Sequence, residues 1–221
     1  MSENSRMVRG IFLDFDGTLV DSSDAYIEAA KRAHESIGSN AFDARMALEI
    51  PKRLELKQPL KEIPSASRSE FLEAYLKTFY EITIEKSRPF SYTDDALREL
   101  SQKAKLALVT MRFTPKASVL AELRNFDLEK YFSYVATGLD TPSPKPSPQA
   151  LLKAADHLNE RLCDCMIVGD SVSDARAGKA ADIITVSVLS GLFTREELTR
   201  EKPDLILETV KDLPSRLDSL K

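Results

Sequence analysis

Short apolar runs rich in β-branched residues recur along the chain, and longer segments separate them. These runs lie at residues 9–14, 105–110, 133–137, 165–169, 183–188 and 204–207. This composition is typical of buried strands. From the second run onward, helical patterns mostly occupy the intervals between the runs. Strands that alternate with helices predict an α/β fold, with a parallel sheet covered by helices on both faces.

Two of these helices have recognisable starts. Thr114 precedes Pro115, and Ser147 precedes Pro148. Because Ser and Thr are favoured N-caps and proline is favoured at the first helical position, we expect Thr114 and Ser147 to cap helices.

The interval between the first two strands is about 70 residues long, far more than one crossover helix requires. Apolar stripes at helical spacing predict helices over 23–38, which ends at Gly38, and over 67–86. Prolines interrupt the stretch between them, and we expect only short pieces there; these prolines are Pro51, Pro59 and Pro64.

The chain therefore divides into two expected domains. The α/β core takes residues 1–19 and 90–221, and the helical insertion takes residues 20–89. A length of 221 residues is enough for one domain that carries a smaller one.

Composition narrows the class of protein. Apolar residues make up 43% and charged residues 30%, as in ordinary globular proteins, and the net charge of -4 argues against general affinity for nucleic acid or anionic membranes. No apolar stretch approaches the roughly 20 residues that span a bilayer, and the first residues lack the apolar core of a secretory signal. The two cysteines, Cys163 and Cys165, are too close to link distant segments. We expect a cytoplasmic protein.

Chemically capable side chains follow four of the predicted strands. They are Asp14, Asp16, Thr110, Lys145, Asp170 and Asp174. In parallel α/β sheets, ligands bind beyond the carboxyl ends of the strands. If adjacent strands bring these ends together, four carboxylates and one ammonium share a crevice.

The charges in such a crevice predict a metal ion. Two carboxylates about 4 Å apart repel by roughly 4 kcal/mol at an effective dielectric of 20, so four need more counter-charge than Lys145 alone supplies. All-oxygen ligation suits Mg²⁺, which commonly shares its coordination with a substrate phosphate. Thr110 offers a hydroxyl and Lys145 a point charge for the same anion. The crevice is therefore suited to Mg²⁺ and a phosphoryl-like group.

Each of these residues also has a simpler interpretation when taken alone. The segment DFDGT resembles a calcium loop, although its glycine, Gly17, comes fourth and not sixth. Asp170 and Asp174 can be a helix N-cap and a surface acid. Lys145 can be a solvated loop lysine.

Taken together, the segments DFDGTLVDS, LVT, KPSP and VGDSVSD resemble the four motifs of the haloacid dehalogenase (HAD) superfamily, in the same order. The insertion resembles the helical cap of its phosphoglycolate phosphatase-like branch. The resemblance implies a Rossmann-like, doubly wound parallel sheet with an inserted α-helical cap domain. It also implies a Mg²⁺-dependent phosphatase that hydrolyses a small phosphorylated metabolite.

The resemblance implies roles for the catalytic residues. Asp14 is the expected nucleophile, which forms an aspartyl-phosphate. Asp16 is the expected general acid and then the base that activates water. Thr110 and Lys145 are expected to hold the phosphoryl oxygens. An acid at position 16 favours phosphoryl transfer over dehalogenation, since dehalogenating members lack it.

The resemblance also implies the metal ligands. Asp14, the backbone carbonyl of Asp16 and Asp170 are expected to bind Mg²⁺. Asp174 is expected to bind the ion or to orient its waters.

The chain departs from the family pattern at some positions. After Thr110, relatives usually have a small polar residue, whereas this chain has Met111 and then Arg112. Arg112 either pairs with an anionic substrate or points to solvent. Asp182 stands where relatives often have glycine, and aspartate tolerates a left-handed conformation.

Several functions share these motifs. A phosphomutase of the β-phosphoglucomutase type is one alternative, and a pyrophosphatase or nucleotidase is another. A non-catalytic phosphate-binding protein ranks last, because every catalytic position is filled. We expect a small phosphorylated metabolite as partner, no nucleic acid or membrane, and a monomer or homodimer; the natural substrate stays open.

Overall fold

The computed structural model describes residues 7–220 and divides the chain into two compact units. One unit holds the described residues up to Val20 and from Pro89 onward, and the other spans Asp21–Arg88. The first six residues and the last one, which the predicted core ranges include, lie outside the described part.

The larger unit is built on a six-stranded sheet in the order β5-β4-β1-β6-β7-β8, in which every neighbouring pair is parallel. The strands are β1 (Gly10–Leu13), β4 (Lys105–Val109), β5 (Phe132–Ala136), β6 (Cys165–Gly169), β7 (Ile184–Val188) and β8 (Leu205–Leu207). The first and last residues of each strand lie within one residue of the ends of a predicted apolar run. The predicted α/β fold with a parallel sheet is confirmed.

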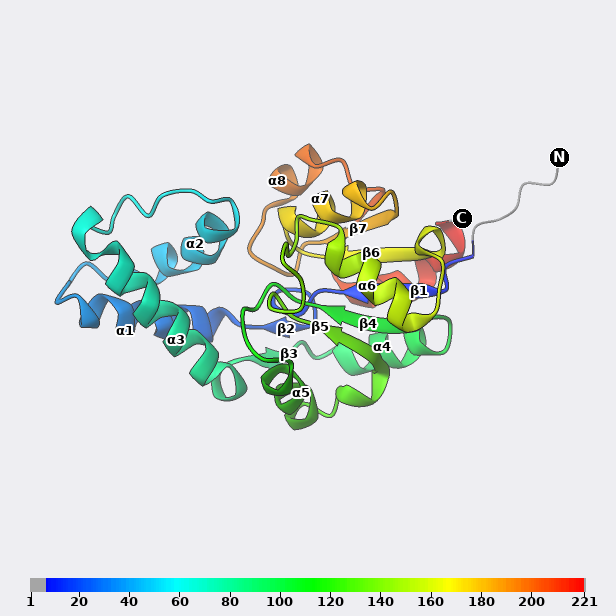
Figure 1. Ribbon diagram of the computed structural model, residues 1–221, viewed down its shortest axis with the longest axis horizontal. Helices are drawn as coiled ribbons and strands as arrows, with labels where there is room; N and C mark the ends of the chain where they lie inside the picture. The colour runs from blue at the N-terminus through cyan, green and yellow to red at the C-terminus, as the bar shows by residue number, and fades with distance from the viewer. Residues whose placement is uncertain (1–6, 221) are drawn as a thin grey trace. The chain divides into compact units, whose positions relative to one another are not determined.

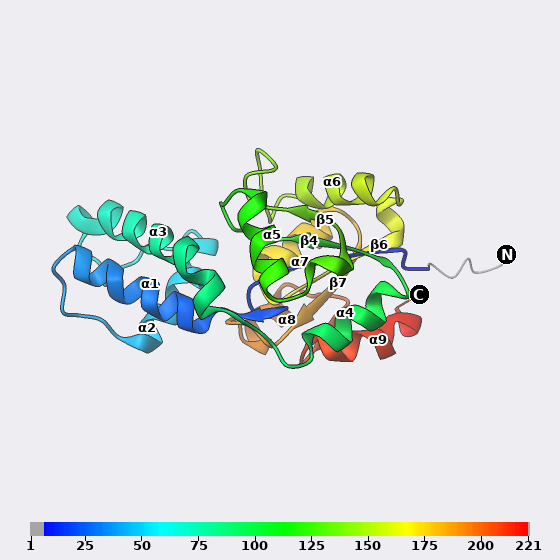
Figure 2. The same cartoon turned by 90° about the horizontal axis from the view of Figure 1, so that it is seen from below.

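Helices cover both faces of this sheet (Figures 1 and 2). On one face lie α6 (Gln149–Leu158) and α7 (Val172–Ala180); on the other lie α4 (Thr93–Ser101), α5 (Lys116–Asn125) and α9 (Leu213–Arg216). A short helix, α8 (Arg195–Arg200), contacts α7. Single 3-10 turns complete this unit: η2 (Glu129–Tyr131), η3 (Leu162–Asp164), η4 (Val210–Asp212) and η5 (Leu217–Ser219).

The alternation of side chains along β1 shows how the two layers form. Phe12 packs in the cluster under α6 and α7, whereas Ile11 and Leu13 pack in the cluster with α4 and α5. Both faces of the strand are therefore buried, which explains the continuous apolar sequence of β1.

The register of β1 determines where the chemically capable residues emerge. Leu13, the last residue of β1, pairs with Leu108 of β4 on one side and with Val168 of β6 on the other. The loops that follow β1, β4 and β6 consequently leave the sheet side by side at one edge.

The smaller unit is helical, with α1 (Ser23–Ser36), α2 (Ala44–Glu55), η1 (Ser65–Ser67) and α3 (Arg68–Lys86). Its own apolar cluster includes Phe71, Tyr75 and Phe79 of α3 and the alanines of α1. Strands β2 (Val20–Asp21) and β3 (Arg88–Pro89) pair with each other where the chain passes between the units. Among the described residues, no helix has both the length and the apolar character needed to cross a membrane.

One expectation for this unit is wrong at Pro51, which lies inside α2 and does not interrupt it. A proline in a helix removes one hydrogen bond, here the one to the carbonyl of Ala47, but the rest of the helix can persist. Asp43 caps its first turn by accepting from Arg45 N and Met46 N. The buried side chains of Ala47 and Ile50 join the unit's core and hold the helix in place.

The two predicted N-caps are also wrong, by one residue each. The cap residues are Pro115 for α5 and Pro148 for α6, so the helices begin after the prolines and not at them. Pro115 has an extended ψ of 140°, which places it outside the helix. Ser147 Oγ still accepts a hydrogen bond from Gln149 N at 3.4 Å.

Candidate active site

The edge of the sheet at the carboxyl ends of β1, β4 and β6 collects the predicted residues. Asp14 follows β1, Thr110 follows β4, and Asp170 follows β6. Because β1 lies between the other two strands, these residues leave three adjacent strands. Edges of this kind are where parallel α/β proteins bind their ligands.

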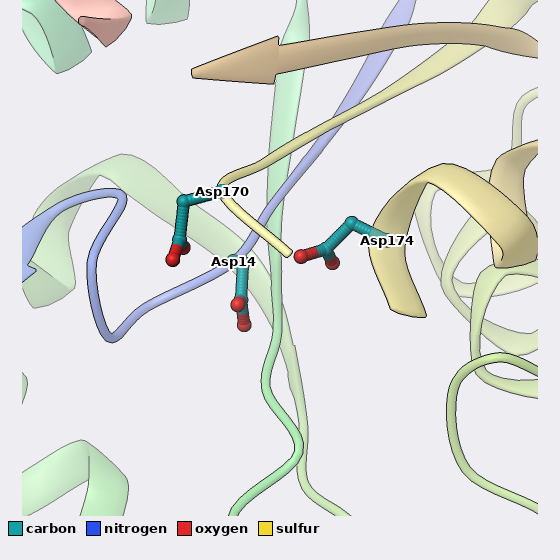
Figure 3. A group of neighbouring side chains, drawn as sticks. All are labelled: Asp14, Asp170 and Asp174. Atoms are coloured by element: carbon teal, nitrogen blue, oxygen red, sulfur yellow. The ribbon is translucent and has the colours of Figure 1, made fainter. Parts of the chain in front are cut away.

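Three carboxylates meet there. Asp14, Asp170 and Asp174 are all buried, and each offers an oxygen that lies within 4.8 Å of an oxygen of the others. Figure 3 shows the three side chains, which come from the loop after β1, the loop after β6 and α7. A buried group of three carboxylates is an all-oxygen donor set that fits a hard divalent cation.

Lys145 contacts two of these three carboxylates, Asp14 and Asp174. Its Nζ is 2.9 Å from Asp14 Oδ1, donates to Asp174 Oδ1 at 2.6 Å, and donates to the carbonyl of Val109 at 2.8 Å. Burial alone would lower the pKa of Lys145, but the two carboxylates raise it above its ordinary value. Lys145 is 2% exposed, so its interpretation as a solvated loop lysine is wrong.

The charge of the group is not balanced by Lys145 alone. Burial, followed by the charge of Asp174, raises the pKa of Asp14 from 3.8 to about 7, although Lys145 opposes this shift. A carboxylate that resists ionisation in this way gains a counter-charge when a cation binds. The donor set and its electrostatics therefore both fit a divalent metal ion.

The loop after β1 holds Asp170 in place. Thr18 is fully buried, and its hydroxyl donates to Asp170 Oδ1 at 2.8 Å. Gly17 adopts a φ of +77°, and a Cβ atom there or at Gly191 would collide with the Asp170 carboxylate. Thr18 was not predicted as a site residue, although it lies inside the first motif, DFDGTLVDS.

Asp174 is held by the start of α7. Ser171 caps this helix: its Oγ accepts from Asp174 N at 3.2 Å and donates to Asp174 Oδ2 at 2.7 Å. This arrangement is a capping box, and its S-x-x-D spacing is visible in the sequence. The alternative interpretation is wrong for both acids, because Ser171 is the N-cap and Asp174 is buried at 1% exposure.

Thr110 lies at the same edge and is buried. Its backbone N–H donates to the carbonyl of Ala136 of the neighbouring strand β5 at 3.0 Å. Its hydroxyl accepts from the backbone N–H of Arg112 at 3.3 Å, which leaves its own proton to donate.

Asp16 has a different main partner from the three clustered carboxylates. Its side chain forms a two-pronged ion pair with Arg112, from Nε to Oδ2 at 2.7 Å and from Nη2 to Oδ1 at 2.6 Å. Its carboxylate is not one of the three that could hold a metal ion. The group of Asp16 that is predicted to bind the metal ion is its backbone carbonyl, and that prediction stays a prediction.

Arg112 does not point to solvent, so the second of the two alternatives given for it is wrong. The guanidinium is 4% exposed and also pairs with Glu122 of α5, which is 1% exposed. Burial alone would lower the pKa of Arg112, but Asp16 and Glu122 raise it above its ordinary value. Glu122 was missed, and nothing in the sequence distinguishes it from a surface glutamate of an amphipathic helix.

Comparisons with known proteins agree with this geometry. Residues 11–188 match the family model described as haloacid dehalogenase-like hydrolase. The phosphoglycolate phosphatase of Escherichia coli (strain K12) is 30% identical over 231 residues, which cover 93% of this chain and 91% of the relative. The phosphoglycolate phosphatase of Shigella boydii is 29% identical over the same shares.

Solved structures show the same fold. A haloacid dehalogenase-like hydrolase from Streptococcus pneumoniae superposes with a TM-score of 0.79 at 21% identity, over 94% of this chain and 97% of that one. A protein of Thermotoga maritima assigned as a β-phosphoglucomutase gives a TM-score of 0.70 at 25% identity, over 96% of this chain and 100% of the other.

Proposed function

Since the chain belongs to the haloacid dehalogenase-like hydrolase family, we propose that it is a Mg²⁺-dependent phosphatase of the phosphoglycolate phosphatase type. Its substrate is a small phosphorylated metabolite. The observation that carries this proposal is the buried group of Asp14, Asp170 and Asp174, in which Asp14 and Asp174 pair with the buried ammonium of Lys145. Such a group favours the binding of a divalent cation together with a doubly charged phosphate.

The residues present fit Mg²⁺. Asp14, Asp170 and Asp174 supply hard oxygen donors, and burial together with the charge of Asp174 raises the pKa of Asp14. The backbone carbonyl of Asp16 is the fourth proposed ligand. When bound, the ion neutralises charge on the phosphoryl oxygens.

The chemistry proceeds in two halves on this chain's own residues. In the first, an Asp14 oxygen forms a bond to phosphorus, the bond from phosphorus to the leaving oxygen breaks, and Asp16 gives that oxygen a proton. In the second, Asp16 takes a proton from water, whose oxygen attacks phosphorus and releases the Asp14 carboxylate.

Thr110 and Lys145 hold the phosphoryl group during both halves. The Thr110 hydroxyl can donate one hydrogen bond, and the Lys145 ammonium already lies 2.9 Å from the attacking carboxylate. Positive charge placed beforehand around a transferring phosphoryl group is a major source of rate acceleration.

The helical unit has no assigned part in this chemistry. Its boundaries and its role as a cap are a further part of the proposal: residues 20–89 would select the organic portion of the substrate. This view is supported by the placement of Asp14, Thr110, Lys145, Asp170 and Asp174 outside that unit.

The test is phosphate release by the purified protein with Mg²⁺, on a panel of phosphoglycolate, sugar phosphates, nucleotides and pyrophosphate. We expect turnover of at least one phosphomonoester, which EDTA abolishes. Asp14→Asn should lower kcat by at least about 10³-fold, as the loss of a nucleophile does in other covalent mechanisms. Turnover that persists in Asp14→Asn would contradict the mechanism.

A phosphomutase is the second candidate, because a protein assigned as a β-phosphoglucomutase shares the fold at 25% identity. It needs the same residues but returns the phosphoryl group to a sugar. Isomerisation of a hexose phosphate without net release of phosphate would favour this candidate. Absence of both reactions across the panel would point to a phosphate-binding protein.

A further inference from the structure

We propose that Arg112, anchored by Glu122, is a positioning residue that fixes the carboxylate of Asp16 for proton transfer with the leaving oxygen. The proposal rests on the proposed function, in which Asp16 is the general acid. It assigns to Arg112 an action through Asp16, and not a direct contact with the substrate.

The two hydrogen bonds from Arg112 fix both the position and the plane of the Asp16 carboxylate. Both of its oxygens accept from Arg112, at 2.7 Å from Nε and 2.6 Å from Nη2. Two parallel bonds from a planar guanidinium set the orientation of a carboxylate as well as its position, which a single bond from a lysine does not.

The guanidinium itself is held on further sides. Nη1 donates to Glu122 Oε2, and Nη2 also donates to Glu122 Oε1 at 3.2 Å. The face of the guanidinium lies over the ring of Phe15, 4.7 Å from the ring centre. Arg112 therefore has little freedom to follow Asp16 if Asp16 moves.

The backbone of Arg112 is fixed in the same way. Its N–H donates to the hydroxyl of Thr110 at 3.3 Å, and its carbonyl accepts from Gly138 N at 2.8 Å. A Cβ atom at Gly138 would lie 2.9 Å from the carbonyl of Met111, so the loops after β4 and β5 are closely packed here. A positioning group needs this kind of rigid support.

The paired carboxylate remains open to a substrate. The side chain of Asp16 is 14% exposed, whereas that of Arg112 is 4% exposed, so the accessible surface of the pair belongs mainly to Asp16. A carboxylate offers about four lone-pair directions, so a carboxylate that accepts two bonds from Arg112 can still take part in proton transfer.

Stability alone does not account for the arrangement. A buried ion pair commonly contributes no more than apolar side chains of the same volume would. Helix α5, which holds Glu122, also carries Arg124. This arginine forms an exposed ion pair of similar geometry, in which it donates to both oxygens of Glu129 at 2.7 and 2.8 Å. Arg112 differs from Arg124 in being buried and in its contact with Asp16.

The dependence on the leaving group separates a positioning role from a structural one. An alkoxide must receive a proton as it leaves, whereas a nitrophenolate does not. A misplaced Asp16 therefore slows the cleavage of an alkyl phosphate more than that of an aryl phosphate. The ratio kcat/KM reports this step, because it covers the reaction only as far as the first irreversible step.

The experiment compares 2-phosphoglycolate with p-nitrophenyl phosphate at saturating Mg²⁺. The first variant combines Arg112→Met with Glu122→Gln, so that neither buried charge is left without its partner. We expect kcat/KM to fall roughly 10²-fold for 2-phosphoglycolate, as for other misplaced catalytic groups, and by less than about tenfold for p-nitrophenyl phosphate, which needs no general acid. Arg124→Met is the matched control and should change neither value.

Arg112→Lys is the second variant and keeps the charge in place. Lysine cannot bond both oxygens of Asp16 in one plane, so we expect the same selective loss at a smaller size. This variant answers the question even if the double variant does not fold.

Asp16→Asn supplies the decisive comparison. If Arg112 acts through Asp16, adding Arg112→Lys to Asp16→Asn should cause no further loss on 2-phosphoglycolate. Equal losses on both substrates, or losses that add fully in the combined variant, would overturn the proposal. A wild-type protein without turnover, or an active Asp14→Asn, would instead refute the proposed function.

Discussion

Lys145 is the residue on which the charge balance of the site depends most directly. Its ammonium lies between Asp14 and Asp174, at 2.9 and 2.6 Å, and all three side chains are buried. Without the Lys145 ammonium, the buried carboxylates of Asp14 and Asp174 would repel each other strongly.

Lys145→Met should therefore destabilise the metal-free protein by about 3–5 kcal/mol at pH 8, the usual result of removing one partner from a buried ion pair. Urea unfolding in EDTA measures this loss, and added Mg²⁺ should recover part of it. The matched control is Lys130→Met, whose ammonium pairs with Asp127 at the surface; we expect a change within about 0.5 kcal/mol. Equal effects of the two substitutions would contradict this account.

Asp14 makes the stability of the metal-free protein depend on pH. Its pKa is about 7 in the folded state and 3.8 ordinarily, so between these values the folded protein keeps a proton that the unfolded chain has released. The folded state then binds more protons, and the free energy of unfolding falls as the pH rises. The Asp14→Asn variant has no carboxyl group at this position, so its free energy of unfolding does not fall with pH for this reason.

Thermal unfolding of the two proteins in EDTA, from pH 4 to pH 8.5, tests this linkage. We expect Asp14→Asn to become more stable than the wild type as pH rises, with the difference levelling off above about 7. A difference that stays constant or shrinks with rising pH would refute the assignment. Saturating Mg²⁺ should reduce the difference, since the ion binds the ionised carboxylate.

At the scale of elements, the first turn of α7 joins helix stability to the site. Ser171 both caps the helix and bonds the carboxylate of Asp174. Helix α8 has the same type of capping box, made by Thr194 and Glu197, neither of which is one of the three clustered carboxylates.

Ser171→Ala and Thr194→Ala should each cost about 1 kcal/mol of stability, the usual value of an N-cap. Only Ser171→Ala should also weaken Mg²⁺ binding, by roughly tenfold or more, because a group that orients a metal ligand is lost. Calorimetric titration with Mg²⁺ distinguishes the two. Unchanged Mg²⁺ affinity in Ser171→Ala would mean that the serine acts on the helix alone.

At the scale of the whole molecule, the two units have separate cores. The two apolar clusters of the sheet contain none of the described residues of Asp21–Arg88, and the third cluster lies entirely within that range. The connecting strands β2 and β3 pair with each other, so the ends that a deletion would join are adjacent.

Replacing residues 21–88 with a short Gly-Ser linker should therefore leave a folded α/β unit. We expect cooperative thermal unfolding and stabilisation by Mg²⁺, of about 2.7 kcal/mol at 100 times the dissociation constant. If residues 20–89 select the substrate, the shortened protein should lose discrimination between phosphoglycolate and p-nitrophenyl phosphate. A shortened protein that unfolds without cooperativity would show that the units depend on each other.

Most of the sheet could be predicted from the sequence because buried parallel strands have a local signature. The six apolar runs match the six strands within one residue, and Asp182, expected to tolerate a left-handed conformation, has a φ of 54°. The errors lie where local rules compete with packing. Pro51 stays inside α2 because Ala47 and Ile50 bury their side chains in the core of the helical unit.

The sequence by itself determined the order of strands and helices and the residues at the strand ends, since periodicity and motif spacing are local properties of the chain. Only the tertiary structure decided the partners of those residues. Thr18 binds Asp170 across 152 positions, Lys145 lies between Asp14 and Asp174, and the pair of Arg112 and Glu122 holds Asp16 across 96 positions. Such contacts depend on how the loops pack at the sheet edge. The spacing of residues in the sequence does not determine which buried charged groups pair with each other.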